Sequence, residues 1–205
     1  QVPEFSMRFL IWLLSHTMYR VRHVGLEAIP DKGAAVLVCN HVSYVDACLL
    51  AGAIRRPIRF VMHESIYRIP VLNFIFRTGR TIPIVAQKDN PEVYESAFRE
   101  IREGLAAGEL LCIFPEGRLT MDGEVGQFRR GVERMIKETP VPVVPLALRG
   151  LWGSFFSREG KGPFKGWRGR PWSRGDVIAG DPLLPAAVQA DTLRKRVLAL
   201  RGSHR

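Results

Sequence analysis

One polar cluster directly follows an apolar run and has residue types suited to catalysis. The segment NHVSYVD at residues 40–46 comes immediately after AAVLVC. An imidazole changes its protonation near neutral pH and can act as a general base, while a carboxylate can fix its tautomer and support its charged form. His41 is therefore the candidate base and Asp46 its partner.

The spacing of these two residues restricts where they can lie. Residues five apart on a regular helix point about 140° away from each other. His41 and Asp46 meet only if His41 sits in the turn after a strand and Asp46 in the first turn of the next helix, where sites form in α/β sheets. Such a pair is the orienting half of a triad, with the nucleophile supplied by the substrate. The alternative is that His41 caps the helix and Asp46 complements its dipole.

A second polar cluster, Glu116-Gly117-Arg118, follows the apolar run LLCIFP. Arg118 is suited to hold a phosphate through paired hydrogen bonds, and Glu116 to accept from substrate hydroxyls. Gly117 allows a ligand to approach the backbone closely. The alternative is that Glu116 and Arg118 pair with each other at a surface turn.

Short apolar runs alternate with helical patterns along most of the chain. Strands are predicted at residues 34–40, 58–63, 81–85, 110–115, 141–148 and 176–180, and helices at 45–54, 69–77, 91–107, 127–138 and 186–200. The third helix should begin with Asn90 as N-cap and Pro91 in its first turn. This alternation predicts an α/β fold with a mostly parallel central sheet flanked by helices.

The N-terminal segment from Phe5 to Tyr19 is apolar but shorter than the roughly 20 residues that span a bilayer. With Arg8, Arg20 and Arg22 around it, it predicts an amphipathic helix in the lipid interface, or one packed on the core. We therefore divide the chain into a membrane-interface helix over residues 1–22 and a catalytic domain over 23–205.

The chain is basic, with a formal net charge of +10. Residues 155–174 interrupt the alternation as a long loop rich in glycine and basic residues, with Trp167 and Trp172. Such a loop can stack nucleic-acid bases, or bind a membrane surface or an acidic carrier protein. We favour the membrane or the carrier, and expect no nucleic-acid partner, because the apolar segment from Phe5 to Tyr19 supplies a matching element.

The remaining reactive residues argue against two other classes of site. Cys39, Cys48 and Cys112 lie in apolar runs without zinc-site or disulfide spacing, which predicts buried, reduced thiols and no metal. The stretch around Ser154 does not match the GxSxG nucleophile elbow of serine hydrolases.

The two polar clusters together resemble the motifs of the glycerolipid acyltransferases, which include the 1-acylglycerol-3-phosphate acyltransferases. Residues 40–46 resemble the first motif, NHxSxxD, and FPEG at residues 114–117 resembles the third. The Pro-bearing apolar segment VPVVPL at 141–146 resembles the fourth. The resemblance runs in order over roughly residues 20 to 150.

This resemblance implies a reaction and its participants. Acyl-CoA or acyl carrier protein would be the donor and a lysophospholipid the acceptor, with no metal or organic cofactor. His41 would be the base, Asp46 its partner, and Glu116, Gly117, Arg118 and Ser43 would bind the acceptor. The reaction would take place at the cytoplasmic face of a membrane.

Two positions depart from the family pattern. Leu119 and Val85 stand where the third and second motifs usually carry arginine, and Arg77 and Arg80 are the nearest candidates to replace the second. Both departures resemble the branch that reacylates 2-acylglycerophosphoethanolamine, often within a fused protein. The start at Gln1 fits a segment of such a fusion.

Overall fold

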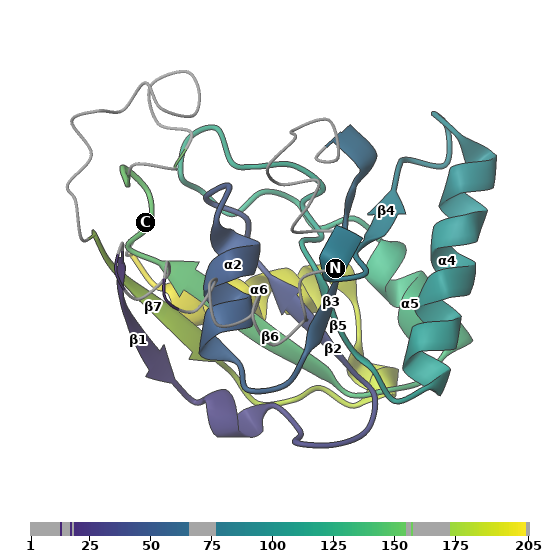
Figure 1. Ribbon diagram of the computed structural model, residues 1–205, viewed down its shortest axis with the longest axis horizontal. Coiled ribbons are helices and arrows are strands. Elements are labelled where there is room, and N and C mark those ends of the chain that lie inside the picture. The colour runs from purple at the N-terminus through teal and green to yellow at the C-terminus, as the bar shows by residue number, and fades with distance from the viewer. Residues whose placement is uncertain are drawn as a thin grey trace.

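A seven-stranded sheet forms the centre of the computed structural model, which describes residues 19–65, 77–154 and 173–203 together with Leu13, Thr17 and Ser157. The strand order is β1-β7-β6-β2-β5-β3-β4 (Figure 1). Only the β6–β7 pair is antiparallel. The predicted mostly parallel sheet is therefore confirmed. The strands are β1 (Tyr19–Val24), β2 (Ala35–Cys39), β3 (Ile58–His63), β4 (Ile82–Ile84), β5 (Leu110–Ile113), β6 (Val143–Arg149) and β7 (Ser173–Ala179).

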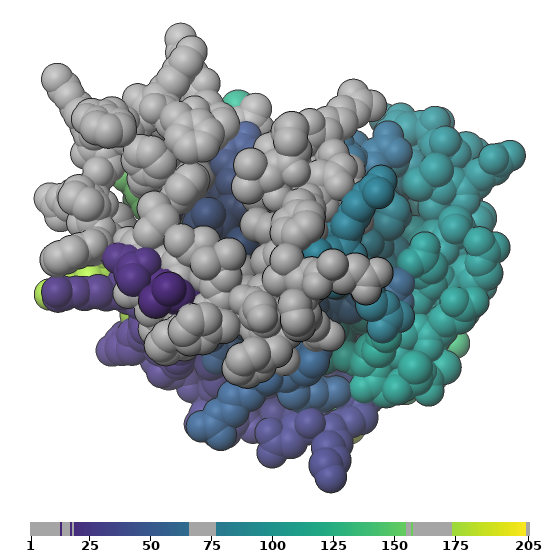
Figure 2. Space-filling view, viewed as in Figure 1, coloured from purple at the N-terminus to yellow at the C-terminus, as the bar shows by residue number. Residues whose placement is uncertain are grey.

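Helices cover both faces of the sheet. They are α2 (Asp46–Ala53), α4 (Pro91–Ala106), α5 (Gly131–Glu138) and α6 (Ala190–Arg201), with short 3₁₀ turns at Leu26–Ala28 and Pro185–Ala187. Helix α2 packs on one face, and α4, α5 and α6 pack on the other (Figure 1). In the space-filling view, β1 in purple and α4 in teal lie on opposite sides of the molecule (Figure 2).

The central strand β2 is apolar because both of its faces are buried. Val36 and Val38 point into the core under α4, α5 and α6, while Leu37 and Cys39 point into the core under α2. All five residues of the strand are buried, as expected for a parallel strand covered on both faces. Continuous apolar runs of this kind were predicted correctly as strands.

Side-chain signals also set the start of α4. Asn90 accepts a hydrogen bond from the Val93 backbone N–H at 3.1 Å, and Pro91 occupies the first helical turn. The predicted N-cap is therefore confirmed. Pro91 has no backbone N–H, and its place in the first turn costs no hydrogen bond because the first N–H groups of a helix have no partner within it.

Parallel pairing brings five strand ends to one edge of the sheet. Strands β6, β2, β5, β3 and β4 run in the same direction, so their carboxyl ends lie together. The chain leaves β2 at Asn40 and His41, and leaves β5 at Phe114 and the third motif. This edge is where the two polar clusters meet.

The predicted boundary after residue 22 is corrected, because Tyr19–Val24 forms the edge strand β1 and pairs in parallel with β7. Only Tyr19 in this strand is buried, and the five residues after it are two arginines, a histidine and two valines without a regular alternation. In the sequence, these basic residues look like the charged flank of the apolar segment before them, so the strand was predicted as part of the N-terminal helix. Arg22, predicted as a basic flank of that helix, instead pairs with Asp176 on β7.

Several other bounds differ from their predictions, among them the starts of α5 and β7. Helix α5 begins at Gly131 rather than residue 127, and the Arg129 N–H before it donates to the Pro115 carbonyl. Strand β7 begins at Ser173, inside the predicted loop 155–174. The predicted helix 69–77 lies outside the described residues except for its last position.

The N-terminal helix stays a prediction, since most of residues 1–18 lie outside the described part of the chain. Leu13 and Thr17 are helical, and the Thr17 hydroxyl donates to the Leu13 carbonyl at 2.8 Å. Among the described residues, no helix has both the length and the apolar character needed to cross a membrane.

Candidate active site

The backbone of His41 is held on both sides by the segment that follows β5. Its N–H donates to Oε1 of Glu116 at 2.8 Å. Its carbonyl oxygen accepts from the backbone N–H of Thr120 at 3.0 Å. The ends of two neighbouring strands are thereby locked together at the position of the imidazole.

The carboxylate of Asp46 closes the turn between β2 and α2. Its Oδ2 lies 2.9 Å from Nδ1 of His41 and accepts from the backbone N–H groups of Val42 at 2.6 Å and Ser43 at 2.9 Å. Asp46 is fully buried and is the first residue of α2. Because an ionised carboxylate can only accept, Nδ1 donates to it and Nε2 is left as the basic nitrogen.

The imidazole ring is fixed by stacking as well as by hydrogen bonding. Its centroid lies 4.3 Å from that of Phe114, with 20° between the ring planes. Phe114 in turn stacks on Phe60, with 6.4 Å between centroids. Only 17% of the His41 side chain is exposed, and Nε2 has no hydrogen-bond partner in the described part of the chain. This nitrogen is free to meet a substrate.

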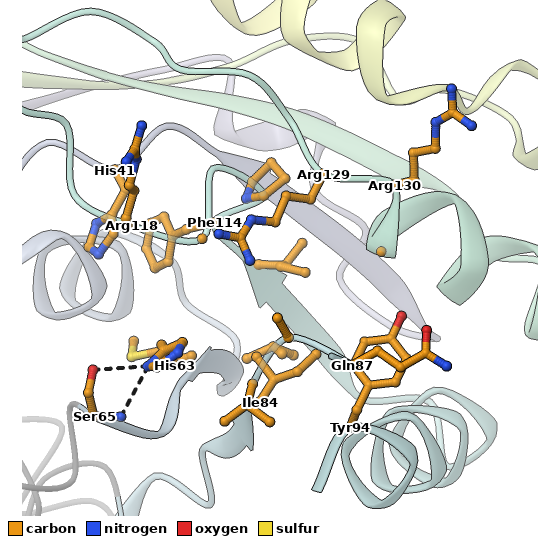
Figure 3. A pocket seen from close by; sticks show the side chains of 18 of the residues that line it. His41, His63, Ser65, Ile84, Gln87, Tyr94, Phe114, Arg118, Arg129 and Arg130 are labelled. Atoms are coloured by element: carbon orange, nitrogen blue, oxygen red, sulfur yellow. Dashed lines mark hydrogen bonds between the residues drawn. The ribbon is translucent and has the colours of Figure 1, made fainter. Parts of the chain in front are cut away.

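His41 lines a cavity of about 880 Å³ at the edge of the sheet (Figure 3). One part of its wall is apolar, formed by Val61, Met62, Ile84, Val85, Ile113, Phe114 and Leu119. Another part is basic, formed by Arg118, Arg129, Arg130 and Arg134. No Asp or Glu among the described residues lines it. The cavity therefore suits a ligand with an apolar chain and an anionic group.

Three of these arginines have no counter-charge in the part of the chain that the structure describes. Arg118, Arg129 and Arg130 are exposed and form no ion pair with any described residue. Arg134 differs, because it binds Glu95 and Glu138 and lies over the ring of Phe98. Arg134 is thus neutralised, and the other three carry the positive charge of the cavity.

Gly117 permits one of these arginines to lie close to the backbone. Its φ of 67° is in the left-handed region that favours glycine. A Cβ at this position would lie 2.8 Å from Cζ of Arg129. Any larger residue at Gly117 would displace the guanidinium.

Comparison with protein families assigns this arrangement to a known class. A family model described as acyltransferase matches residues 20–149. The chain belongs to the acyltransferase family. The matched segment contains the His41–Asp46 pair, Glu116 and all four arginines of the cavity.

Individual relatives agree with this assignment. A chloroplastic 1-acyl-sn-glycerol-3-phosphate acyltransferase of Arabidopsis thaliana is 28% identical over 136 residues, which are 66% of this chain and 37% of the relative. A 1-acyl-sn-glycerol-3-phosphate acyltransferase of Pseudomonas aeruginosa is 28% identical over 163 residues, 78% of this chain and 60% of the relative. The chain thus matches less than two thirds of the length of these proteins.

The fold is that of a solved structure. The crystal structure of PlsC, the 1-acyl-sn-glycerophosphate acyltransferase of Thermotoga maritima, superposes with a TM-score of 0.73 at 23% identity. The superposition covers 96% of this chain and 75% of the PlsC chain. The α/β fold predicted from the sequence is that of this acyltransferase.

Two predicted acceptor-binding residues of the present chain, Glu116 and Ser43, lie behind the cavity wall. Glu116 is buried, and its two carboxylate oxygens accept from the backbone N–H groups of His41 and Gly126. Ser43 is fully buried, and its hydroxyl lies 3.4 Å from the Val45 backbone nitrogen. Neither lines the cavity, and the hydrogen bonds of both lie within or beside the His41 turn.

Arg77 and Arg80, the predicted replacements for the arginine of the second motif, also lie outside the cavity lining. The Arg80 guanidinium binds Glu109 at 3.1 Å and is 71% exposed. Arg77 is exposed at the start of the described segment 77–154. Of the predicted acceptor-binding residues, the structure brings Gly117 and Arg118 to the cavity.

Arg129 and Arg130 were missed by the sequence analysis. They lie more than ten positions beyond the third motif, and only the return of the chain at Pro115 brings them beside it. The one sequence feature that could have pointed to them is that two adjacent arginines lie between an apolar residue, Phe128, which is buried, and Gly131, at which α5 begins.

The two departures from the family pattern both face this cavity. Val85 and Leu119, which stand where the family usually has arginine, are buried in its apolar wall. The positive charge of the cavity lining therefore comes from other positions, which include Arg118, Arg129 and Arg130.

The cysteine thiols are not poised for chemistry. Burial raises the pKa of Cys48 to about 11 and holds the pKa of Cys39 and of Cys112 well above the usual range. All three therefore remain protonated at neutral pH, and a thiol is a poor nucleophile. The described residues contain no group of His, Cys, Asp or Glu side chains that could hold a metal ion.

Stability should depend on pH through Glu116. Burial raises the pKa of its carboxyl above the ordinary 4.5, although the Gly126 and His41 N–H groups partly offset this effect. A raised folded-state pKa contributes stability that is present below the unfolded-state value and is lost as pH rises through the folded-state value. We expect the free energy of unfolding of the parent, relative to Glu116→Gln, to fall as pH rises above about 4.5.

Urea unfolding of both proteins from pH 4 to pH 8 measures this difference. The contributions of the other titrating groups to the free energy of unfolding cancel in this difference, because the two proteins differ only at residue 116. A difference that stays constant over this range, or that increases with pH, would contradict the raised pKa.

Proposed function

We propose that this acyltransferase moves an acyl chain from a thioester donor, acyl-CoA or acyl carrier protein, to a hydroxyl of a lysophospholipid such as 1-acylglycerol-3-phosphate. The observation that carries the proposal is that His41 lines a cavity that combines an apolar wall with three arginines, and that neither its Nε2 nor these arginine side chains have a partner among the described residues. The names of the Arabidopsis and Pseudomonas relatives support the same acceptor.

His41 acts as the general base. Its Nε2 takes the proton of the acceptor hydroxyl as the oxygen attacks the thioester carbonyl carbon. The tetrahedral intermediate then expels the thiolate, which receives this proton from the imidazolium. Asp46, hydrogen-bonded to Nδ1 at 2.9 Å, supports the imidazolium in between.

The reaction is a direct transfer to the acceptor without an acyl-enzyme. Ser43 is fully buried, and the three thiols stay protonated, so none of them is an activated nucleophile. The proposed reaction also uses no metal or organic cofactor. The acyl chain lies along Val61, Ile84 and the neighbouring apolar side chains.

The phosphate of the acceptor binds to the basic side of the cavity. Arginine guanidinium groups bind phosphate oxygens through paired, charge-assisted hydrogen bonds. Arg118, Arg129 and Arg130 are available for this role because no described carboxylate neutralises them. These bonds place the glycerol hydroxyl near Nε2 of His41.

The lining favours an anionic head group over a zwitterionic one. An ethanolamine ammonium would find three arginines and no described carboxylate in the lining. Reacylation of 2-acylglycerophosphoethanolamine, which the departures at Val85 and Leu119 resemble, is the second candidate. An N-acylphosphatidylethanolamine synthase of Arabidopsis thaliana is also similar to the chain, at 29% identity over 138 residues.

We also propose that the protein works at the cytoplasmic face of a membrane, peripherally or tethered through a fused domain. The formal net charge of +10 supports this location, because anionic lipid head groups attract basic proteins. A lysophospholipid acceptor is itself found in membranes. The predicted contacts, from Phe5 to Tyr19 and within residues 155–174, fall mostly outside the described residues.

Removal of the base should abolish turnover. We expect His41→Ala to lower kcat by about 10² to 10⁴-fold, which is the usual contribution of general-base catalysis. The assay follows transfer in detergent from labelled acyl-CoA and labelled acyl carrier protein to lysophosphatidate and lysophosphatidylethanolamine. Circular dichroism controls for folding, and parent-like turnover by a folded His41→Ala variant would refute the mechanism.

Removal of the unpaired arginines should weaken acceptor binding. We expect Arg129→Gln and Arg130→Gln each to raise KM for lysophosphatidate about tenfold, because a charge-assisted hydrogen bond contributes about 1.5 to 3 kcal/mol. KM for an uncharged monoacylglycerol should change little. Arg80→Gln, outside the cavity lining, is the matched control. Equal changes in KM for both acceptors would show that these arginines do not bind the phosphate.

Binding to lipid vesicles should depend on charge and salt. We expect the protein to float with vesicles that contain anionic phospholipid at low ionic strength, and less at 0.5 M salt, where attraction over more than a few ångströms is screened. Vesicles of neutral phosphatidylcholine are the control. RNA binding without vesicle binding would overturn this proposal and favour the nucleic-acid alternative.

A further inference from the structure

The C-terminal helix α6 holds the loop that follows the third motif. This loop, residues 120–126, receives hydrogen bonds from two arginines of the helix. Arg194 donates through Nε to the Gly126 carbonyl at 2.8 Å and through Nη2 to the Val125 carbonyl at 3.0 Å. Arg201 donates through Nη1 to the Gly123 carbonyl at 2.9 Å and through Nη2 to Glu124 Oε2 at 2.7 Å.

The same loop holds the catalytic turn at both of its ends. At its start, the Thr120 N–H donates to the His41 carbonyl at 3.0 Å. At its end, the Gly126 N–H donates to Glu116 Oε2 at 2.7 Å, and Oε1 of this carboxylate accepts from the His41 N–H at 2.8 Å. The loop therefore lies between α6 and the two hydrogen bonds that fix the His41 backbone.

We infer that α6 is part of the catalytic apparatus, with Arg194 and Arg201 as positioning residues that hold His41 through the 120–126 loop. The inference rests on the base role of His41 proposed above. Helix α6 lies outside residues 20–149, which the acyltransferase family model matches. The contribution thus comes from a part of the chain beyond that matched segment.

The chemistry of these contacts suits positioning. A guanidinium has a planar set of donors that can hold two acceptors of one loop at fixed spacing, which an ammonium cannot do. Arg201 is only 6% exposed, and its bond to the Gly123 carbonyl is buried, while its bond to Glu124 is partly buried. Small displacements matter here, since misplacing a catalytic group by about 1 Å can cost about 10²-fold in rate.

Helix α6 also has a packing role, which the test must separate from positioning. Leu193 and Val197 are fully buried in the core beneath the sheet. Arg194 is only partly buried and Arg196 is exposed, with no hydrogen bond to any described residue. Arg196→Ala is therefore a matched control for Arg194→Ala on the same helix.

The experiment measures kcat and KM for transfer to lysophosphatidate, and the NMR signals of the His41 imidazole, in the parent and both variants. We expect Arg194→Ala to lower kcat about tenfold, to leave KM within twofold and to shift the His41 signals. Arg196→Ala should change none of these. Arg194→Lys, which can donate to one of the two carbonyls, should recover part of the lost rate.

The outcomes separate positioning from stability and from the proposed function. A folded Arg194→Ala protein with parent-like kcat and unshifted His41 signals overturns the inference, as does an equal loss in both variants. If the parent transfers no acyl chain to any acceptor, the proposed function fails. The His41 signals then decide alone: a shift in Arg194→Ala but not in Arg196→Ala supports positioning, and no shift refutes it.

Discussion

The buried carboxylate of Glu116 joins the parts of the site that the chain brings from different places. One of its oxygens accepts from the His41 backbone after β2, and the other accepts from Gly126 after the third motif. A carboxylate can take both bonds because both of its oxygens are acceptors. Burial disfavours its charge, and the surrounding N–H groups compensate in part. The active-site edge of the sheet depends on this one side chain.

Charge pairing divides the arginines of this protein into two groups. Arg59, Arg134 and Arg149 each bind acidic side chains and tie neighbouring elements together. Arg118, Arg129 and Arg130 bind none among the described residues, and all three belong to the lining of one cavity. Unpaired cations gathered beside a base and an apolar wall match the parts of a lysophospholipid. The family pattern places arginine at the positions of Val85 and Leu119, so the basic residues that line this cavity stand at other positions.

The sequence was sufficient wherever one local pattern determines structure. The apolar runs that became β2 and β5, the Asn90 cap of α4, and the meeting of His41 and Asp46 across a strand-to-helix turn could all be predicted. Strand β1 could not, since an edge strand with one buried residue has little periodic signal.

The contacts of the site depended on tertiary structure. Sequence cannot show that both oxygens of Glu116 are already occupied, so it was predicted to bind the acceptor. Arg129 and Arg130 reach the cavity only because the chain doubles back on Pro115. Of the predicted residues in the third motif, Gly117 and Arg118 line the cavity and Glu116 does not, while Arg129 and Arg130 line it only through the fold.

The pairing of β1 with β7 has a consequence for how the protein folds during synthesis. Arg22 and Asp176, which pair across these strands, are 154 residues apart in the chain. Strand β1 therefore cannot pair until the chain through β7 has been synthesised, and such distant contacts slow folding. Helix α6 follows β7, so the arginines that bind the 120–126 loop are made later still. A nascent chain would form the His41–Asp46 turn early and complete the support of this turn only after α6 has been synthesised.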